Sequence, residues 1–576
     1  MSAVLIAVAA FVAYLAAYYT YGRRVASRLL GFEAERATPA QRYADGVDYV
    51  PSRRLVLFGH HFATIAGLGP IMGPAIAVIW GWLPALLWVI FGSIFMGAVH
   101  DLAALYLSLR HEGKSIGDIT GNILGPRGRT LFLVLTFFLL ALAMGAFAHV
   151  IGILFTPSFY PQAVIPVWAL IGIAVLIGIM VYRWRVPLTP ATLLGVGLML
   201  AAVWWGADHP VTSLPGLGDL SLDRWVWILM AYALLASILP VWLLLQPRDY
   251  LNSFQLYIGM ALLFAGLFVT RPAIVAPAFN NVPADLPPLF PFLFITVACG
   301  AISGFHSLVS SGTTAKQLAS ERDGLFVAYG AMLTEGMLAV LAILATSAGF
   351  ASRAEWSAHY ASWASADGLG PKLQAFVQGG ANLCAGLGLN PELMAIFIAV
   401  VVVGFAMTTL DSGTRLLRYN LEELGSHFRP LGVLTARRWG AALVAVLAIG
   451  YFAVIRVDGK PAGITLWALF GISNQLLGAL GFLVMTLWFY RAGRPFFYLL
   501  LPMTFMMAVT LIALPYSLWR FMHATTVSWP LVGTGLVILG LDLWLILEAV
   551  LSLSRLRAER RGLRAATPLP GTEAAT

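Results

Sequence analysis

Long apolar runs follow one another along almost the entire chain, separated by short polar or proline-containing stretches. A helix needs roughly 20 apolar residues to cross about 30 Å of hydrocarbon, and on that criterion the runs predict about fifteen membrane-spanning helices. In the first half we expect them near residues 3–21, 56–80, 84–109, 129–156, 164–182, 189–207, 225–245 and 255–270. In the second half we expect them near residues 291–314, 327–350, 393–412, 439–455, 463–490, 498–519 and 527–552.

The composition agrees with a chain that lies mostly in lipid. Of the 576 residues, 60% are hydrophobic and 11% are charged, and the mean hydropathy is +0.84. Soluble domains are nearer to about half apolar and about a quarter charged. We therefore expect the lipid bilayer to be the main solvent of this protein. The run at 3–21 lacks the charged start and the Ala-x-Ala exit of a cleaved signal peptide, so we interpret it as a helix.

Lysine and arginine fall into short loops on alternate sides of these runs. The first such loop contains Arg23, Arg24, Arg28, Arg36, Arg42, Arg53 and Arg54. Strict alternation places these further cations on the same side: Arg110, Lys114, Arg127, Arg183, Arg185, Lys316, Arg415, Arg418, Arg437, Arg438, Arg491 and Arg494. Because cytoplasmic loops are enriched in Lys and Arg, the pattern predicts an inner-membrane protein with its amino terminus outside and its carboxyl tail in the cytoplasm. Topology then accounts for the net charge of +9, and we expect no nucleic-acid partner.

The order of the runs predicts a repeated organisation. After the first helix, seven runs precede the proline-rich stretch at 283–291 and seven follow it, and an odd number of helices forces the second copy to be inverted. The predicted units are an N-terminal helix in 1–30, a first repeat in 31–282, a second repeat in 283–552 and a cytoplasmic basic tail in 553–576. The segment 351–391 is expected to be an external loop with a short helix, and the last dozen residues are expected to be disordered.

A glycine- and proline-rich stretch interrupts the second run. Gly67, Gly69 and Gly73 weaken the helix, and Pro70 and Pro74 remove backbone donors, so this span is expected to unwind within the membrane. Exposed carbonyls and half-helix amide ends at such a break can bind ions or carboxylates. The alternative is a structural kink that allows close helix packing.

Hydroxyl side chains are concentrated in the ninth run and just after it. They can supply donors and acceptors to a polar solute that leaves water. The group consists of Ser303, Ser307, Ser310, Ser311, Thr313 and Thr314, with Gly304 and His306 among them and Lys316 beside them. Serine and threonine also join helices by small-residue packing, which is the alternative role. Lys316 either binds a carboxylate or anchors the helix end at the interface.

Carboxylates inside apolar runs are costly and by default mark ion or proton paths. Asp101, Glu335 and Asp411 are the candidates, with Thr408 and Thr409 beside the last of them. Asp411 is close enough to the end of its run to be interfacial instead, and Asp101 can pair with a basic loop.

Among the histidines within apolar runs, His60, His61 and His306 are the candidates. They can shuttle protons because an unperturbed imidazole titrates near about pH 6.5, although a buried histidine is more often a packing residue. A metal site would require a third ligand with suitable spacing, and none is found, so we expect neither a metal nor another cofactor. The two cysteines lack the spacing of metal ligands and cannot form a disulfide framework.

Polar residues lie on both sides of Pro247, directly after the run at 225–245. Gln246, Arg248, Asp249 and Asn252 are interpreted as a cytoplasmic gate, with an ordinary turn as the alternative. Asn474 and Gln475 lie within a later run and are expected to hold helices together.

At these same positions the chain closely resembles the carbon starvation protein A family of bacterial inner-membrane transporters. The resemblance rests on several strings in order, from about residue 40 to 480: Asp45 to Pro51, Phe58 to Phe62 with Gly67, Gly69 and Pro70, Gln246 to Asn252, Ser303 to Gln317, Met407 to Asp411, and Asn474 with Gln475. It implies a secondary transporter that takes up peptides or pyruvate during carbon starvation stress.

The resemblance also implies an inverted-repeat fold related to the amino acid, polyamine and organocation transporters, which is leucine-transporter-like and has discontinuous helices. The runs at 56–80 and 291–314 would be the two unwound core helices, and the helix ending at Asp411 would border the ion site. The two helices in 225–270 would be additional to a core of five plus five helices.

The leading hypothesis is therefore proton-coupled uptake of a small carboxylate such as pyruvate, or of short peptides. The residues expected to bind the substrate are His60, His61, Gly67, Gly69, Ser303, Gly304, His306, Ser307, Ser310, Ser311, Thr313 and Lys316. Ion coupling is assigned to Asp101, Glu335, Thr408, Thr409 and Asp411, and sodium, held by carbonyls and Thr408 or Thr409, is the alternative ion. A homo-oligomer stays an open alternative.

Functions of other classes are a metal-dependent membrane hydrolase that uses His60 and His61, or a nutrient sensor. The chain contains neither His-Glu-x-x-His nor Gly-x-Ser-x-Gly, so we expect no enzyme activity. A sensor would need an output domain, and no soluble domain is evident.

Overall fold

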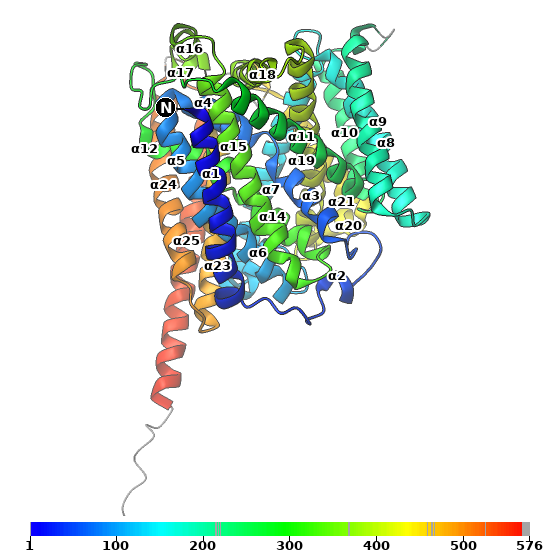
Figure 1. The fold of residues 1–576 in the computed structure, drawn as a ribbon. Coiled ribbons are helices and arrows are strands. Elements are labelled where there is room, and N and C mark those ends of the chain that lie inside the picture. The colour runs from blue at the N-terminus through cyan, green and yellow to red at the C-terminus, as the bar shows by residue number, and fades with distance from the viewer. Residues whose placement is uncertain are drawn as a thin grey trace, which may run out of the picture.

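The protein is a bundle of helices that run along one common direction (Figure 1). The computed structural model describes residues 2–566, apart from 214, 215, 217, 219, 367, 368, 458, 462–464, 466 and 525. Most of the predicted disordered tail thus lies outside the described residues. Within the described part, the only strands are β1 (Arg456–Val457) and β2 (Lys460–Pro461), which pair antiparallel. The predicted all-α membrane architecture is therefore confirmed.

Eleven described helices are long and apolar enough to cross a membrane, or twelve when the bent pair α3 and α4 counts as one span. The long helices are α1 (Ala3–Ala17, continued by π-helical turns to Leu30), α5 (Trp82–Gly92) with α6 (Ala98–Arg110), α7 (Ile116–Leu154), α8 (Val164–Gly178), α9 (Leu188–Asp208), α11 (Leu245–Thr270), α15 (Gly330–Ala348), α19 (Pro391–Gly425), α23 (Trp467–Arg491), α24 (Phe497–Met522) and α25 (Trp529–Ala566).

The predicted count of about fifteen spans is not confirmed, because three of the predicted runs form helices shorter than the roughly 20 residues of a usual span. Two of them are the helices α10 (Leu222–Ile238) and α21 (Arg438–Val454), each of 17 residues. The third is divided into α12 (Leu289–Thr296), α13 (Ala298–Ala301) and α14 (Gly304–Gly312).

Two spans are broken in the middle, as predicted. α3 (Arg54–Ala66) and α4 (Gly69–Ala77) meet at an angle of 43°. Gly67 at the break has φ +39°, a conformation that residues with a Cβ rarely adopt. The second break lies between α13 and α14, where Ile302 and Ser303 are extended. Each break leaves a short helix whose amino end begins inside the bundle.

The two broken spans make reciprocal contacts. α4 packs against α15, whereas α14 packs against α6, and α7 and α19 pack against one another between them. Each broken span thus lies beside the helix that follows the other broken span in the sequence. An inverted repeat produces this exchange of partners, since the two copies share an axis in the membrane plane.

The expectation that the helices of 225–270 are additional to a core of five plus five helices stays a prediction, but these helices pack inside the bundle. α11 packs along α3 and α19, and α10 packs along α21 and α19. α8 and α9 pair with each other at one edge of the bundle (Figure 1). The reason is chemical: α11 carries buried polar residues that need partners on other helices, whereas α9 offers mainly apolar side chains that suit lipid.

Two other boundaries differ from the prediction. The segment predicted as a loop at 351–391 is largely helical, with α16 (Arg353–His359), α17 (Trp363–Ala366) and α18 (Leu369–Ala385). α19 continues well past the expected end at 412, because its polar residues are buried and find partners inside the bundle. Apolar length alone therefore underestimates a helix whose polar part lies in the protein interior.

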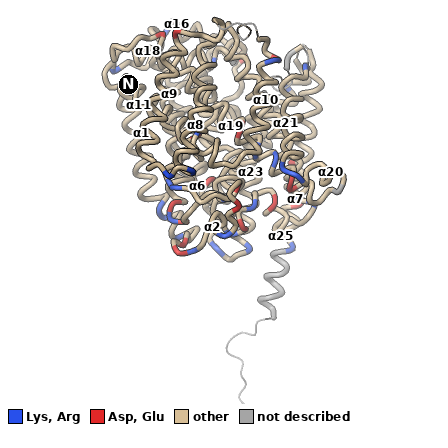
Figure 2. Tube along the Cα trace, turned by 90° about the vertical axis from the view of Figure 1, so that its right-hand side faces the viewer, with Lys and Arg blue, Asp and Glu red and all other residues tan. Residues whose placement is uncertain are grey.

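Charged residues gather mainly at one end of the bundle, the end that carries α2 (Pro39–Arg42) and α20 (Arg429–Thr435) (Figure 2). The opposite end carries α16 and α18, and α1 begins there. The bundle is thus asymmetric along its long direction.

Candidate functional site

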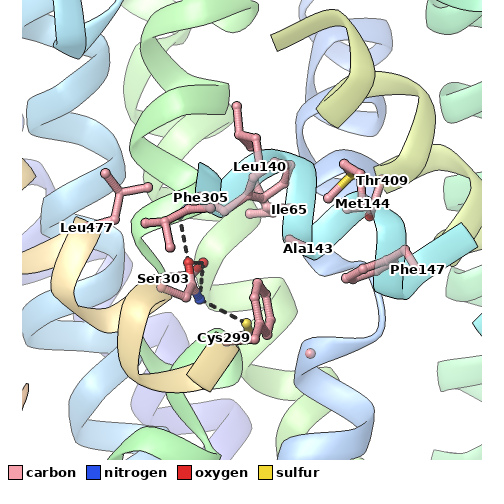
Figure 3. Close-up of a pocket in the computed structure, with 15 residues that line it drawn as sticks. Ile65, Leu140, Ala143, Met144, Phe147, Cys299, Ser303, Phe305, Thr409 and Leu477 are labelled. Atoms are coloured by element: carbon pink, nitrogen blue, oxygen red, sulfur yellow. Dashed lines mark hydrogen bonds between the residues drawn. The ribbon is translucent and has the colours of Figure 1, made fainter. Parts of the chain in front are cut away.

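A cavity lies between the two helix breaks (Figure 3). The lining residues are Ile65, Gly67, Gly69, Leu139, Leu140, Ala143, Met144, Phe147, Cys299, Ser303, Phe305, Thr409, Phe470, Asn474 and Leu477. None of these is Lys, Arg, Asp or Glu, so the described wall of this central cavity carries no ionised side chain.

Asn474 organises the polar side of the central cavity. Its Nδ2 donates to Ser303 Oγ at 3.0 Å and to Cys299 Sγ at 3.2 Å. Its Oδ1 accepts the backbone N–H of Phe305 at 3.0 Å. Asn474 thus joins α23 to the break before α14, which is the packing role predicted for it, and it also lines the cavity.

The amino ends of two half-helices meet this cavity. Gly69 is the first residue of α4, and Ser303 is the residue that precedes α14; both line the cavity. The amino end of a helix carries a partial positive charge and backbone N–H groups without intrahelical partners. Two such ends at one cavity favour a bound anion.

Oxygen atoms of α3 and α19 lie close together beside the first break. Thr409 Oγ1 donates to the carbonyl oxygen of Thr64 at 3.2 Å, and the hydroxyls of Thr64 and Ser412 are 3.2 Å apart. All three side chains are buried. This group consists of uncharged oxygens next to the carboxyl end of a half-helix.

A separate group of titratable side chains, His100, Asp101, His306 and Glu335, is fully buried, and we call it the acid–histidine cluster. His306 Nδ1 lies 3.2 Å from Asp101 Oδ2, and His306 Nε2 lies 3.5 Å from Glu335 Oε2. His100 Nδ1 is 3.6 Å from Asp101 Oδ1. Both oxygens of Glu335 lack a hydrogen-bond partner. The charge of such a group depends on how many protons it holds.

His60 belongs to a second buried network rather than to the central cavity. Its Nδ1 lies 2.6 Å from Asp249 Oδ2, and Gln317 Nε2 lies 3.3 Å from its Nε2. Gln246 Nε2 donates to Gln317 Oε1 at 2.6 Å. This network connects α3, α11 and the segment after α14.

The predicted turn at Gln246 to Asn252 is instead the first two turns of α11, and its polar residues are buried. Pro247 is the third residue of the helix, where a missing N–H costs no hydrogen bond, so it does not break the helix. Asn252 Nδ2 donates to Thr408 Oγ1 at 3.1 Å. These residues hold α11 against α19 inside the bundle, so the prediction of a loop at this position is wrong.

Asp411 is not interfacial, which corrects the alternative derived from its place in the sequence. It is fully buried in the middle of α19 and forms an ion pair with Arg248. Tyr232 Oη donates to Asp411 Oδ2 at 2.7 Å. The pair neutralises two charges that would be very costly alone.

A buried cluster of charged residues lies in the bundle near the end that carries α2. Asp48 lies 2.6 Å from an Nη of Arg415 and 3.1 Å from an Nη of Arg418. Burial raises the pKa of Asp48, but the Arg418 and Arg415 guanidiniums outweigh it and hold that pKa well below its usual range. Arg415 also donates to the carbonyl oxygens of Ala236 and Leu239. The prediction that Arg415 and Arg418 lie in a loop is wrong, because α19 continues past them and buries both.

Of the residues predicted to bind the substrate, Gly67, Gly69 and Ser303 line the central cavity, and so does Thr409 from the predicted ion site. Lys316 lines a second cavity. The others lie outside the central cavity: His60, His61, Gly304, His306, Ser307, Ser310, Ser311 and Thr313. Most of their hydroxyls bond within the helix, as Ser307 Oγ does to the carbonyl oxygen of Gly304 at 2.8 Å.

The lining residues that the sequence did not indicate are mainly apolar or small: Ile65, Leu139, Leu140, Ala143, Met144, Phe147, Cys299, Phe305, Phe470 and Leu477. No polarity signal distinguishes them from the apolar residues that face lipid.

The chain is similar to known transporters over most of its length. The family described as "Carbon starvation protein CstA" matches residues 2–354 and 352–513. A protein of Escherichia coli named "Peptide transporter CstA" is 34% identical over 550 residues, which cover 86% of this chain and 78% of the relative. A Bacillus subtilis protein of the same name is 34% identical over 516 residues, covering 84% and 85%. An Escherichia coli protein named "Pyruvate/proton symporter BtsT" is 32% identical over 558 residues, covering 84% and 77%.

Among solved structures, a mutant of a manganese transporter from Eremococcus coleocola aligns with 89% of this chain and 99% of its own, at 13% identity and a TM-score of 0.47. The family match and the curated relatives confirm the predicted class, a multi-pass membrane transporter rather than an enzyme. The chain belongs to the carbon starvation protein CstA family.

Proposed function

We propose that this protein imports a small carboxylate of the pyruvate class together with protons. The observation that carries the proposal is the meeting of two half-helix amino ends, at Gly69 and Ser303, on one enclosed cavity. Backbone N–H groups and the Ser303 and Asn474 side chains would receive the carboxylate, so no cationic side chain is needed.

The central cavity favours a small carboxylate over a peptide. A peptide brings an ammonium group as well as a carboxylate, and the ammonium needs an acidic partner when it leaves water. The described lining offers none. Short peptides are the second candidate, because several relatives are named peptide transporters.

The acid–histidine cluster supports a proton as the coupling ion. Two ionised carboxylates with only neutral imidazoles between them would carry an uncompensated charge in the bundle interior, so the cluster is stabilised by at least one added proton. His306 lies on the first turn of α14, three residues after Ser303 in the cavity wall. Protonation at His306 would thus act on the same half-helix that binds the substrate.

The other group of oxygens, around Thr64, Thr409 and Ser412, makes sodium the alternative ion. Sodium is held by uncharged carbonyl and hydroxyl oxygens at the unwound parts of transporter helices. This group has hydroxyls and a helix-end carbonyl at such a break. Separate proton and sodium gradients distinguish the two ions.

We further propose that the end of the bundle with α2 and α20 faces the cytoplasm and that the amino terminus lies outside. Charged residues are concentrated at this end (Figure 2), and cytoplasmic segments are enriched in Lys and Arg. In this orientation the Asp48 cluster closes the cytoplasmic side of the pathway.

The decisive experiment measures uptake of labelled pyruvate and of a labelled dipeptide into proteoliposomes, with proton and sodium gradients imposed separately. Wild type should concentrate pyruvate under an inward proton gradient alone. Glu335→Gln should lose this accumulation but keep pyruvate exchange across the membrane without a gradient, because the amide occupies the same space and cannot take up the proton.

Asp542→Asn is the matched control, since Asp542 is another buried carboxylate but lies on α25, away from the cluster. It should transport like wild type. Accumulation driven only by sodium would contradict proton coupling, and uptake of the dipeptide without pyruvate would contradict the substrate class.

A further inference from the structure

A second cavity continues along the helices that line the central cavity. Leu140 of α7 lines both cavities. α19 contributes Thr409 to the central cavity and Tyr419 to the second one. These residues are ten positions apart, and a rise of about 1.5 Å per residue separates them by roughly 15 Å along the helix. The second cavity is therefore displaced toward the end of the bundle that carries α20.

The second cavity contains a buried cation, Lys316, on which the carboxylates of Asp48 and Glu423 act only from beyond ion-pair distance. Lys316 is only 9% exposed, and among the described residues no carboxylate oxygen lies within the 4.0 Å of an ion pair. Its Nζ lies 3.7 Å from the centre of the Tyr419 ring, a cation–π contact that orients the ammonium. The nearest acidic residue in the lining, Glu423, accepts a hydrogen bond from Ser115 Oγ at 2.6 Å.

Two further polar groups of this cavity lack partners. Thr136 Oγ1 and Asn420 Oδ1 are buried without a hydrogen bond, and their residues are 2% and 5% exposed. Such a group loses its hydration without compensation, so a ligand that bonds to it is held more tightly. The Asn420 amide can turn over and present either its oxygen or its NH₂ to a ligand. Together, Lys316, Thr136 and Asn420 offer a ligand one cation and two neutral hydrogen-bonding groups.

We propose that the second cavity is a carboxylate-binding station between the central cavity and the cytoplasmic end of the pathway. Lys316 binds the carboxylate of the substrate there, and Thr136 and Asn420 bind its other polar atoms. The proposal rests on the proposed function, since it uses the same substrate class. Leu140 separates the two stations, and the Asp48 cluster closes the path beyond them.

The test is equilibrium binding of labelled pyruvate to the purified full-length protein in lipid nanodiscs. Wild type should bind two molecules per chain. Lys316→Gln should weaken one of the two sites by about tenfold or more, as expected for the loss of a hydrogen bond to a charged group, and leave the other unchanged. Lys316→Arg keeps the charge and should retain both sites.

Thr136→Val keeps the side-chain shape and removes only the hydroxyl, so it tests the station if Lys316→Gln does not fold. It should weaken the same site by about threefold or more. One site in wild type, or two unchanged sites in both Lys316→Gln and Thr136→Val, would overturn the second station while the proposed function stands. No binding to wild type would overturn the substrate class and the station together.

Discussion

Arg248 and Asp411 illustrate how much of this protein depends on paired polar side chains. Both are fully buried, each is the other's ion-pair partner, and Tyr232 adds a hydrogen bond. A buried ion pair is usually no more stable than two well-packed apolar residues, but the loss of one partner leaves an uncompensated charge. Substitution of only one member of the pair is therefore expected to lower the stability of the bundle.

We expect Arg248→Met and Asp411→Leu each to destabilise the protein by about 3–5 kcal/mol, and the double variant to be closer to wild type than either single variant. The reason is that only the single variants leave a charge without a partner. Thermal unfolding in detergent, followed by tryptophan fluorescence, measures the three midpoints. A double variant that shows the sum of the two single effects would mean that the residues do not interact.

Sequence reasoning identified the chemistry of these residues better than their positions. Asp411, Asp101 and Glu335 were predicted from their polarity alone, and all three are buried. Their partners could not be predicted, because Arg248 and Asp411 are separated by 163 positions and meet only when α11 packs on α19. A single sequence contains no distance information of this kind.

Helix breaks are encoded locally, and this is why they were predicted well. Gly67 and the prolines that follow it weaken the helix wherever it packs, whereas the length of α19 depends on its neighbours. The same holds for α11, whose first turns are polar and become helical only because α3 and α19 supply partners. Sequence patterns therefore misplace the helices whose polar residues find hydrogen-bond or ion-pair partners on other helices.

α14 is held against α23 so closely that a glycine is required between them. A Cβ at Gly304 would lie 2.3 Å from the carbonyl oxygen of Asn474 and 2.4 Å from the backbone nitrogen of Gly478. Both atoms belong to the backbone, which cannot rotate away from a Cβ as a flexible side chain can. The amino end of α14, and with it one wall of the central cavity, is thus positioned by backbone packing.

Gly304→Ala should therefore push α14 away from α23, lower the thermal midpoint and abolish pyruvate uptake. Gly172→Ala is the matched control, because Gly172 lies on α8 with nothing within 4 Å of a Cβ. It should leave both properties as in wild type, since alanine is the better helix former. Equal effects of the two substitutions would show that the close approach is unimportant.

The orientation of the bundle can be tested with thiol chemistry, because the chain has only two cysteines. In a background of Cys299→Ala and Cys384→Ala, single cysteines at the exposed positions Ser365 and Ser426 probe the two ends. We expect a membrane-impermeant maleimide to label Ser365→Cys in cells with a permeabilised outer membrane, and Ser426→Cys only after the inner membrane is opened. The reverse pattern would place the amino terminus inside.

The central cavity is built from segments that are remote in sequence, and so it could not be predicted as a whole. Gly67, Ser303 and Thr409 were identified from breaks and polarity, but the aromatic and aliphatic walls look like any other apolar run. Which apolar residues face a cavity and which face lipid is decided by the packing of α7 against α19 and α23. That packing is a property of the assembled bundle.

The described wall of the central cavity has no ionised side chain, so a carboxylate bound there would keep its full negative charge. Over a complete transport cycle, the membrane potential acts on the summed charge of the solutes that cross together. One accompanying proton makes the translocated complex neutral, and the membrane potential then contributes nothing to accumulation. A second proton makes each cycle carry one net positive charge inward. The membrane potential then contributes about 2.3 kcal/mol per 100 mV to the accumulation of the substrate. The number of protons thus decides whether a cell accumulates the substrate by its pH difference alone or also by its voltage.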